Sequence, residues 1–220
     1  MVKVREIVRQ NPWWNQGMGF ASYDPHLIKT HPIFFQRKEI DLVRGNIYVL
    51  RGCRQVGKST YLKTIIKQLI EGGVNPKHIL YLSLDFFTSR RELRNTINYF
   101  LNETQEAEII YMLLDEITFL KDWNLEFKYL ADQGITGKSI IIATGSSAVK
   151  LKEKGELLPG RGLEGNEYYI KPLSFREFSL QSIKFIRGIL PNNELRDSLE
   201  RLEENLNRTS IDLSLDLQDI

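Results

Sequence analysis

The chain has 220 residues, enough for one large domain or one and a half, and 42% of them are hydrophobic, which is sufficient for a sizeable core. Its 30 basic and 28 acidic side chains leave a net charge of +2, so the overall charge gives no support for nucleic-acid or membrane binding. The single cysteine, Cys53, excludes a disulfide framework and fits a reducing compartment. We expect a cytoplasmic protein, because no signal peptide is visible and the apolar runs are too short to span a bilayer.

The N-terminal stretch combines a helical pattern with two tryptophans and a predicted loop. Apolar residues at helical spacing over residues 1–11 predict a short amphipathic helix, which Pro12 ends. Trp13 and Trp14 follow; such a pair either caps a hydrophobic core, the interpretation we favour, or stacks on a base or a partner. Glycines and prolines over residues 15–32 predict an extended loop.

The next stretch has the phosphate-binding P-loop pattern (Walker A), G-x-x-x-x-G-K-[ST]. Its residues are Gly52, Cys53, Arg54, Gln55, Val56, Gly57, Lys58 and Ser59. A β-prone run over 47–50 precedes the loop and a helical pattern follows it, which favours a nucleotide site over an ordinary glycine-rich turn. Glycines let backbone N–H groups converge on phosphates, Lys58 can reach the β- and γ-phosphates, and Ser59 can bind Mg²⁺. We predict that ATP binds along the loop as far as Thr60.

Strands and helices alternate after the P-loop. Strands are predicted over residues 79–84, 109–114, 139–143 and 167–170, and helices over residues 90–103, 122–133 and 193–207. Such alternation is typical of an α/β fold, here a three-layer α/β/α sandwich with a mostly parallel central sheet.

The strand over 109–114 leads directly into Asp115 and Glu116, a Walker B pattern. Asp115 is predicted to orient Mg²⁺ beside Ser59, mostly through water. Glu116 then places a carboxylate where the attacking water must be activated, which P-loop GTPases and most P-loop kinases do not need at that position. Alone, the pair would indicate a polar strand end; the upstream P-loop favours the catalytic interpretation.

Three further residues are candidates for the reaction. Thr144 and Ser146 end the next strand, and ligands lie at the carboxyl ends of parallel strands, so their hydroxyls could orient water or sense phosphate loss. A simple polar turn explains them equally well. Arg161 lies in a Gly/Pro-rich turn and is either an arginine finger for the transferring phosphate or a surface arginine.

Two local groups of basic residues are candidates for nucleic-acid patches. They consist of Arg90, Arg91 and Arg94, and of Lys150, Lys152 and Lys154. We favour a solvated surface as the interpretation of both groups, so the charge distribution does not support nucleic-acid binding.

These motifs resemble those of a prokaryotic family of ATPases in the AAA+ superfamily, found in archaea and bacteria. The resemblance rests on the P-loop and on segments 113–117, 143–147, and 160–161 with 171–178, and it covers roughly residues 33–180. It implies a P-loop strand at the centre of the sheet, separated from the aspartate strand by the strand that ends at Thr144. It also implies adenine recognition near residues 33–37.

Family members usually continue into a second domain, so the chain resembles an N-terminal ATPase portion. The resemblance implies an N-terminal extension (1–32), an ATPase core (33–180) and a helical tail (181–220) that begins a lid or second domain. The motif over 172–178 is expected to pack under the sheet or against the missing half.

The predicted function is Mg²⁺-dependent ATP binding and hydrolysis that drives a conformational change. The partner would be a missing C-terminal domain, another protein or a further copy of the chain in a homo-oligomer. The alternative is a nucleotide-gated switch with little turnover that acts on DNA or protein assemblies. A P-loop kinase would need an acceptor pocket and a lid, which no pattern in the chain indicates.

Overall fold

The computed structural model of the chain describes residues 4–28, 40–146, 166–190 and 193–208. Compactness divides the chain after Pro172, and the described residues up to that point form one unit while those after it form a second. The two units are described separately. The expected domain boundaries at residues 32 and 180 stay predictions.

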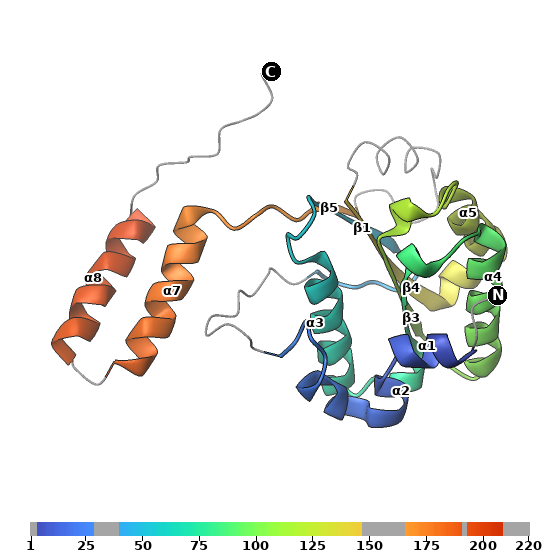
Figure 1. Cartoon of the computed structure of the whole chain (residues 1–220), viewed down its shortest axis with the longest axis horizontal. Coiled ribbons are helices and arrows are strands. Elements are labelled where there is room, and N and C mark those ends of the chain that lie inside the picture. The colour runs from blue at the N-terminus through green and yellow to red at the C-terminus, as the bar shows by residue number, and fades with distance from the viewer. Residues whose placement is uncertain (1–3, 29–39, 147–165, 191–192, 209–220) are drawn as a thin grey trace, which may run out of the picture. The chain divides into compact units, whose positions relative to one another are not determined.

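A five-stranded sheet is the centre of the first unit (Figure 1). Its strands are β1 (Ile47–Arg51), β2 (Ile79–Ser83), β3 (Ile110–Asp115), β4 (Ser139–Gly145) and β5 (Glu167–Tyr169). The order is β2-β3-β4-β1-β5, and every neighbouring pair is parallel. As expected, β4 lies between the P-loop strand β1 and the aspartate strand β3, which brings the carboxyl ends of these three strands together. The expectation that the P-loop strand lies at the centre is wrong for the described sheet, because β5 is the only strand beyond β1 and the middle strand is β4.

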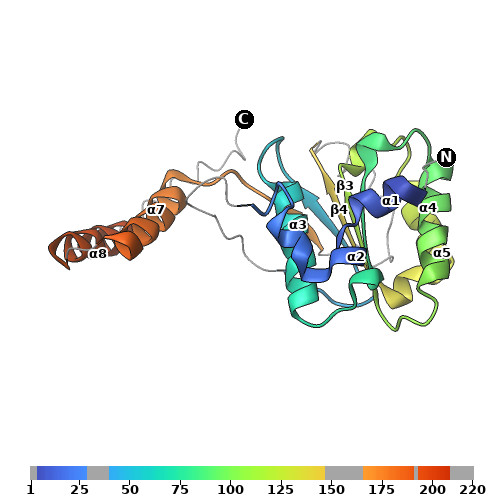
Figure 2. The ribbon, with the colours of Figure 1, turned by 60° about the horizontal axis from the view of Figure 1, so that its bottom comes forward.

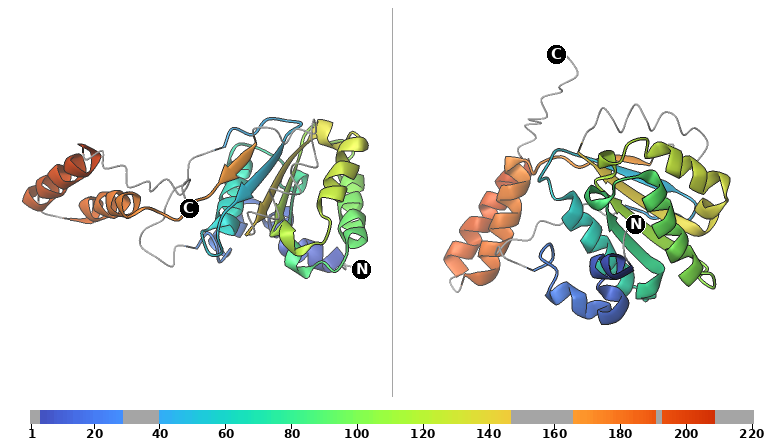
Figure 3. Two further views of the ribbon diagram at one scale, coloured as in Figure 1. Left: turned by 90° about the horizontal axis from the view of Figure 1, so that it is seen from above. Right: turned by 45° about the vertical axis from the view of Figure 1, so that its right-hand side comes forward.

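Helices cover both faces of this sheet, so the chain has the predicted three-layer α/β/α fold (Figures 1 and 3). One face packs against α3 (Lys58–Glu71), and the other packs against α4 (Arg90–Glu103) and α5 (Asn124–Asp132). The central strands are apolar on both sides because successive side chains alternate between the two cores. Ile142, for example, belongs to the α3 core and Ile141 to the α4–α5 core.

Short 3-10 helices complete the connections of this unit. They are η1 (Gly17–Ser22), η2 (Pro76–His78), η3 (Leu84–Phe86), η4 (Ile117–Phe119) and η5 (Ile135–Lys138). The predicted extended loop over 15–32 is therefore wrong for residues 15–22, which lie in helix α2 (Trp13–Gln16) and in η1. The physical reason is Phe20, which is buried with its ring centroid 5.2 Å from that of Trp13 and anchors this helical turn.

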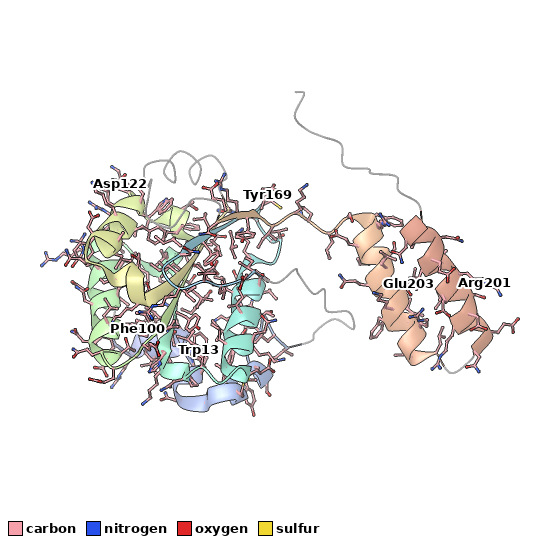
Figure 4. The ribbon with its side chains drawn as sticks, turned by 180° about the vertical axis from the view of Figure 1, so that it is seen from behind. Trp13, Phe100, Asp122, Tyr169, Arg201 and Glu203 are labelled. Atoms are coloured by element: carbon pink, nitrogen blue, oxygen red, sulfur yellow. The ribbon has the colours of Figure 1, made fainter. Side chains whose placement is uncertain are left out.

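The N-terminal segment passes around the free edge of β2, from one face of the sheet to the other (Figure 2). Helix α1 (Val4–Gln10) packs Ile7 into the α4–α5 core, and α2 (Trp13–Gln16) packs Trp13 into the α3 core. In Figure 4, Trp13 lies beside α3, whereas Phe100 belongs to α4 on the opposite face. Trp13 is fully buried, which confirms the interpretation that the tryptophan pair caps the core.

Side chains of the N-terminal segment replace a neighbouring strand along the β2 edge. The indoles of Trp13 and Trp14 donate hydrogen bonds to the carbonyl of Ile79, at 3.0 and 2.7 Å. Two residues further along β2, the side-chain amide of Asn11 hydrogen-bonds to both the N–H and the carbonyl of Tyr81. The side-chain oxygen Oε1 of Gln10 accepts a hydrogen bond from the N–H of Ser83 at 2.8 Å. An unpaired sheet edge invites pairing with other chains, and these contacts occupy it.

The second unit contains two antiparallel helices, α7 (Phe175–Ile189) and α8 (Asn193–Arg208). Ion pairs join them, including Arg187 Nη1 to Glu203 Oε2 at 2.9 Å. The sequence analysis predicted α8 but missed α7, although Ser174 and Glu177 form a capping box at its start. None of the helices in the described ranges is both long and apolar enough to cross a bilayer.

Candidate functional site

The predicted P-loop connects β1 to α3, and its two glycines are required for different reasons. A Cβ on Gly52 would lie 2.6 Å from the carbonyl oxygen of Ile170, so glycine permits the close approach of the chain that follows β5. Gly57 has a φ of +93°, which side chains rarely adopt, and no described atom lies within 4 Å of its potential Cβ. Gly57 thus permits the turn that leads into the start of α3, where backbone N–H groups point outward.

Lys58 is the buried cation of this loop, with only 4% of its surface exposed. Its ammonium donates hydrogen bonds to the carbonyls of Gly52 and Cys53, at 3.1 and 3.0 Å. It also lies 3.4 Å from Oε1 of Glu116. The loop and the acidic strand end are thus already joined by one charged contact. The side chains of Cys53, Arg54 and Gln55 are exposed.

Asp115 ends β3 and is 2% exposed, and both of its carboxylate oxygens accept a hydroxyl. Tyr81 donates to Oδ2 at 2.9 Å, and Thr144 donates to Oδ1. A carboxylate has about four lone-pair positions, so two hydroxyl donors leave others available for a cation or its waters. The two hydroxyls hold the carboxylate in one orientation at the carboxyl edge of the sheet.

Glu116 follows Asp115 in a left-handed backbone conformation, with a φ of +53°. Such a conformation costs a non-glycine residue of order 1–3 kcal/mol and is found preferentially at functional sites. The N–H of Glu116 donates to the Thr144 hydroxyl at 3.0 Å, and Ser146 donates to Oε2 of its carboxylate at 3.0 Å. Thr144 therefore connects the two acidic residues, and Ser146 orients the second of them.

The structure brings most of the predicted site residues together at one edge. Lys58, Asp115, Glu116, Thr144 and Ser146 form a continuous set of contacts at the ends of β1, β3 and β4. Ser59 and Thr60 lie in the first turn of α3, beside this set in sequence. Arg161 lies outside the described residues, so its predicted role as an arginine finger stays a prediction.

Sequence analysis missed a second group of polar residues behind Asp115. Lys63 in α3 is buried, with Nζ 3.6 Å from the ring centroid of Tyr81 and 3.7 Å from Oδ2 of Asp24. Burial lowers the pKa of Lys63 to about 8, although the charges of Asp24 and Asp115 act in the opposite direction. Burial, followed by the charge of Asp115, raises the pKa of Tyr81. The available signal in the sequence was the position of Lys63. It directly follows Leu62 in a helix whose neighbouring apolar residues pack on the sheet.

Two of the three basic residues of the first group, Arg90 and Arg94 in α4, form a structural cross-link. Arg94 donates two hydrogen bonds to the buried carboxylate of Glu126 in α5, at 2.9 and 2.7 Å, and stacks on Tyr129. Arg90 lies 3.7 Å from the same carboxylate. These two arginines therefore join α4 to α5. The second basic group, at residues 150–154, lies outside the described residues.

Comparison with known proteins gives a family and two relatives. A family model described as an AAA domain matches residues 44–179, well over half of the chain. An uncharacterized protein from Haemophilus influenzae is 32% identical over 149 residues, which cover 65% of this chain and 34% of the relative. An uncharacterized protein from Methanocaldococcus jannaschii is 34% identical over 146 residues, which cover 64% of this chain and 29% of the relative. The chain thus spans about a third of the length of these relatives.

The solved structures that resemble this chain have lower sequence identity than these relatives. The replication initiator DnaA bound to AMPPCP and single-stranded DNA is 18% identical, with a TM-score of 0.42 over 74% of this chain and 54% of its own. A Walker-type ATPase of Pyrococcus abyssi is also 18% identical, with a TM-score of 0.40 over 70% of this chain and 57% of its own. Scores this low assign neither a function nor a partner. The family model covers the P-loop and all strands of the described sheet, so the chain belongs to the AAA domain family that this model describes.

Proposed function

We propose that the chain is a Mg²⁺-dependent ATPase module, which binds ATP along Gly52–Thr60 and hydrolyses it with Glu116. One observation carries the proposal. Lys58 at the start of α3 meets Asp115 and Glu116 from the end of β3 in one set of contacts, and Lys58 Nζ lies 3.4 Å from Oε1 of Glu116. A cation for phosphates, a carboxylate for a metal and a second carboxylate for water are the groups that nucleotide hydrolysis needs.

The residues present fit a magnesium ion. Mg²⁺ is usually held by one or two carboxylates together with phosphate oxygens and water. Among the described residues, two hydroxyls donate to Asp115, which leaves lone pairs for an ion, and Ser59 follows Lys58 in the first turn of α3. We assign the ion to Ser59 and Asp115; when bound, it would neutralise charge on the phosphates.

Glu116 would accept the proton of the attacking water. In the structure its Oε1 faces the Lys58 ammonium, and its Oε2 accepts the Ser146 hydroxyl. A Lys58 ammonium that turns to phosphate oxygens leaves Oε1 able to receive a proton. Ser146 keeps the carboxylate oriented meanwhile, and Thr144 holds the backbone of Glu116 next to Asp115. This gives Thr144 and Ser146 orienting roles in the proposed reaction.

The relatives are about three times as long as the matched region. This length supports an ATPase module that acts on a further domain of the same polypeptide. We propose that turnover drives a conformational change in such a domain, in a partner protein or in a second copy of the chain. The pairing of Arg90 and Arg94 with Glu126 gives no support for DNA as the partner.

The test is phosphate release with Mg-ATP by the wild type and by Glu116→Gln. The amide keeps the size of the side chain but cannot accept the proton, so ATP affinity should persist and turnover should fall by roughly 10²-fold or more. Glu103→Gln, at the exposed end of α4, is the matched control and should behave as the wild type. Parental turnover in Glu116→Gln would remove the water-activating role.

Binding is tested separately with Lys58→Ala and, as its control, Lys67→Ala on the exposed side of α3. The first should lose ATP binding while its thermal unfolding stays cooperative, and the second should keep it. Unchanged ATP affinity in folded Lys58→Ala would contradict the P-loop assignment. ATP binding by the wild type without phosphate release would favour the nucleotide-gated switch.

A further inference from the structure

Tyr81 is the contact between the proposed metal carboxylate and the edge of the sheet. It lies on β2, two residues before Ser83, which pairs with Asp115 in the neighbouring strand. Its hydroxyl donates to Oδ2 of Asp115 at 2.9 Å, and its side chain is 6% exposed. A buried tyrosine whose hydroxyl donates a hydrogen bond to a carboxylate fixes the orientation of that carboxylate.

The N-terminal segment holds Tyr81 in this position through its backbone. The Asn11 amide donates to the carbonyl of Tyr81 at 2.9 Å, and its oxygen accepts from the Tyr81 N–H at 2.6 Å. Because β2 is the edge strand, these bonds replace those that a further strand would supply. The position of the Tyr81 backbone therefore depends on residue 11.

The ring of Tyr81 is held from a second direction. The Lys63 ammonium lies 3.6 Å from the ring centroid, an arrangement in which a cation is attracted to the aromatic face. Asp24, which also belongs to the N-terminal segment, lies 3.7 Å from the same ammonium. A continuous path of contacts thus runs from Asp24 through Lys63 and Tyr81 to Asp115.

We propose that Tyr81 is a positioning residue of the nucleotide site and that the N-terminal segment, residues 4–28, belongs to that site because it holds Tyr81 and Lys63 in place. The inference rests on the proposed function, in which Asp115 binds Mg²⁺. Thr144 holds one carboxylate oxygen of Asp115 from β4, and Tyr81 holds the other from β2. Removal of either donor lets the carboxylate rotate away from the orientation in which it binds the ion.

The magnitude follows from the behaviour of such supporting groups in other metal sites. Substitution of residues that hydrogen-bond a metal ligand typically costs 10–100-fold in metal affinity or activity. Tyr81→Phe keeps the ring, its packing and its contact with the Lys63 ammonium, and removes only the hydroxyl. Any change in Mg²⁺ binding is then due to the bond with Asp115.

The experiment measures the affinity of a fluorescent ATP analogue as Mg²⁺ is titrated, so it does not depend on turnover. In Tyr81→Phe the Mg²⁺ concentration at half-effect should rise by roughly 10–100-fold, while affinity in excess EDTA stays that of the wild type. The control is Tyr111→Phe, at the opposite end of β3 from Asp115, which should leave the midpoint unchanged.

The link to the N-terminal segment is tested with Asp24→Asn, alone and combined with Tyr81→Phe. Alone it should raise the Mg²⁺ midpoint, by less than Tyr81→Phe does. In the double variant it should add nothing, because its effect passes through the hydroxyl that is already absent. An additive effect would overturn the proposed path.

The outcomes separate this inference from the proposed function. A Mg²⁺-dependent wild type with the same midpoint in Tyr81→Phe would refute the positioning role and leave the ATPase proposal intact. A wild type whose nucleotide affinity does not respond to Mg²⁺ would refute the metal role of Asp115, and the inference with it. A raised midpoint in Tyr81→Phe at unchanged metal-free affinity supports both.

Discussion

Replacing Asn11 with alanine tests whether side chains of the N-terminal segment take the place of a strand at the β2 edge. Asn11 is 0% exposed, and its amide donates to the carbonyls of Ile7 and Tyr81, at 2.7 and 2.9 Å. Its oxygen accepts from the N–H of Tyr81 at 2.6 Å. Truncation leaves these three backbone groups without the partner they have in the native chain.

The expected loss follows from these three groups. An orphaned buried donor or acceptor costs about 1–3 kcal/mol, so three groups at the lower limit give about 3 kcal/mol of lost unfolding free energy. For a protein of this size, this lowers the melting temperature by roughly 6–12 °C. The loss is a large fraction of a typical total stability of about 5–15 kcal/mol.

Urea denaturation followed by tryptophan fluorescence is the suitable assay. The chain has three tryptophans, Trp13, Trp14 and Trp123, all within the first compact unit, so the signal reports the unit that Asn11 stabilises. The matched control is Asn75→Ala, which removes an exposed cap from η2 and should cost about 1 kcal/mol or less. A loss below about 1 kcal/mol in Asn11→Ala, with an unchanged m-value, would refute the reasoning.

Two further predictions concern Arg161 and Lys63. If Arg161 supplies an arginine finger, the variant Arg161→Ala should bind ATP almost normally and hydrolyse it about 10³–10⁵-fold more slowly. Restored activity on mixing Arg161→Ala with Lys58→Ala would show that the arginine acts on a neighbouring chain. Full activity of Arg161→Ala alone would exclude the role. Burial lowers the pKa of Lys63 from 10.5 to about 8 in the folded chain. The unfolded chain therefore binds more protons than the folded chain at pH values between 8 and 10.5. The Lys63 contribution to unfolding free energy should therefore rise with pH, by about 1 kcal/mol per unit between pH 8 and 10. Denaturation across that range should show this slope in the wild type relative to Lys63→Met, and equal slopes would contradict it.

Much of the fold could be predicted because its signals are local. The helix over 90–103 follows from an apolar period of 3.6, and the strands of the sheet follow from short, nearly continuous apolar runs, which depend only on neighbouring residues. The P-loop followed from a fixed spacing of eight residues, and the resemblance of the motifs to AAA+ ATPases agrees with the matched family. Helix α7 was missed because its capping residues, Ser174 and Glu177, lie in a motif that was interpreted as a packing element.

Only the tertiary structure decided which polar side chains meet. Asn11 and Tyr81 are 70 positions apart, and Tyr81 and Asp115 are 34 apart, so no local pattern relates them. Their contact depends on β2 being the edge strand and on a register that places Ser83 opposite Asp115. In sequence, Tyr81 has the apolar character of its strand, and Asn11 is one polar residue before a proline. Strand order and register turn these residues into a support for the acidic site, because hydrogen bonds depend on positions in space that sequence spacing does not specify.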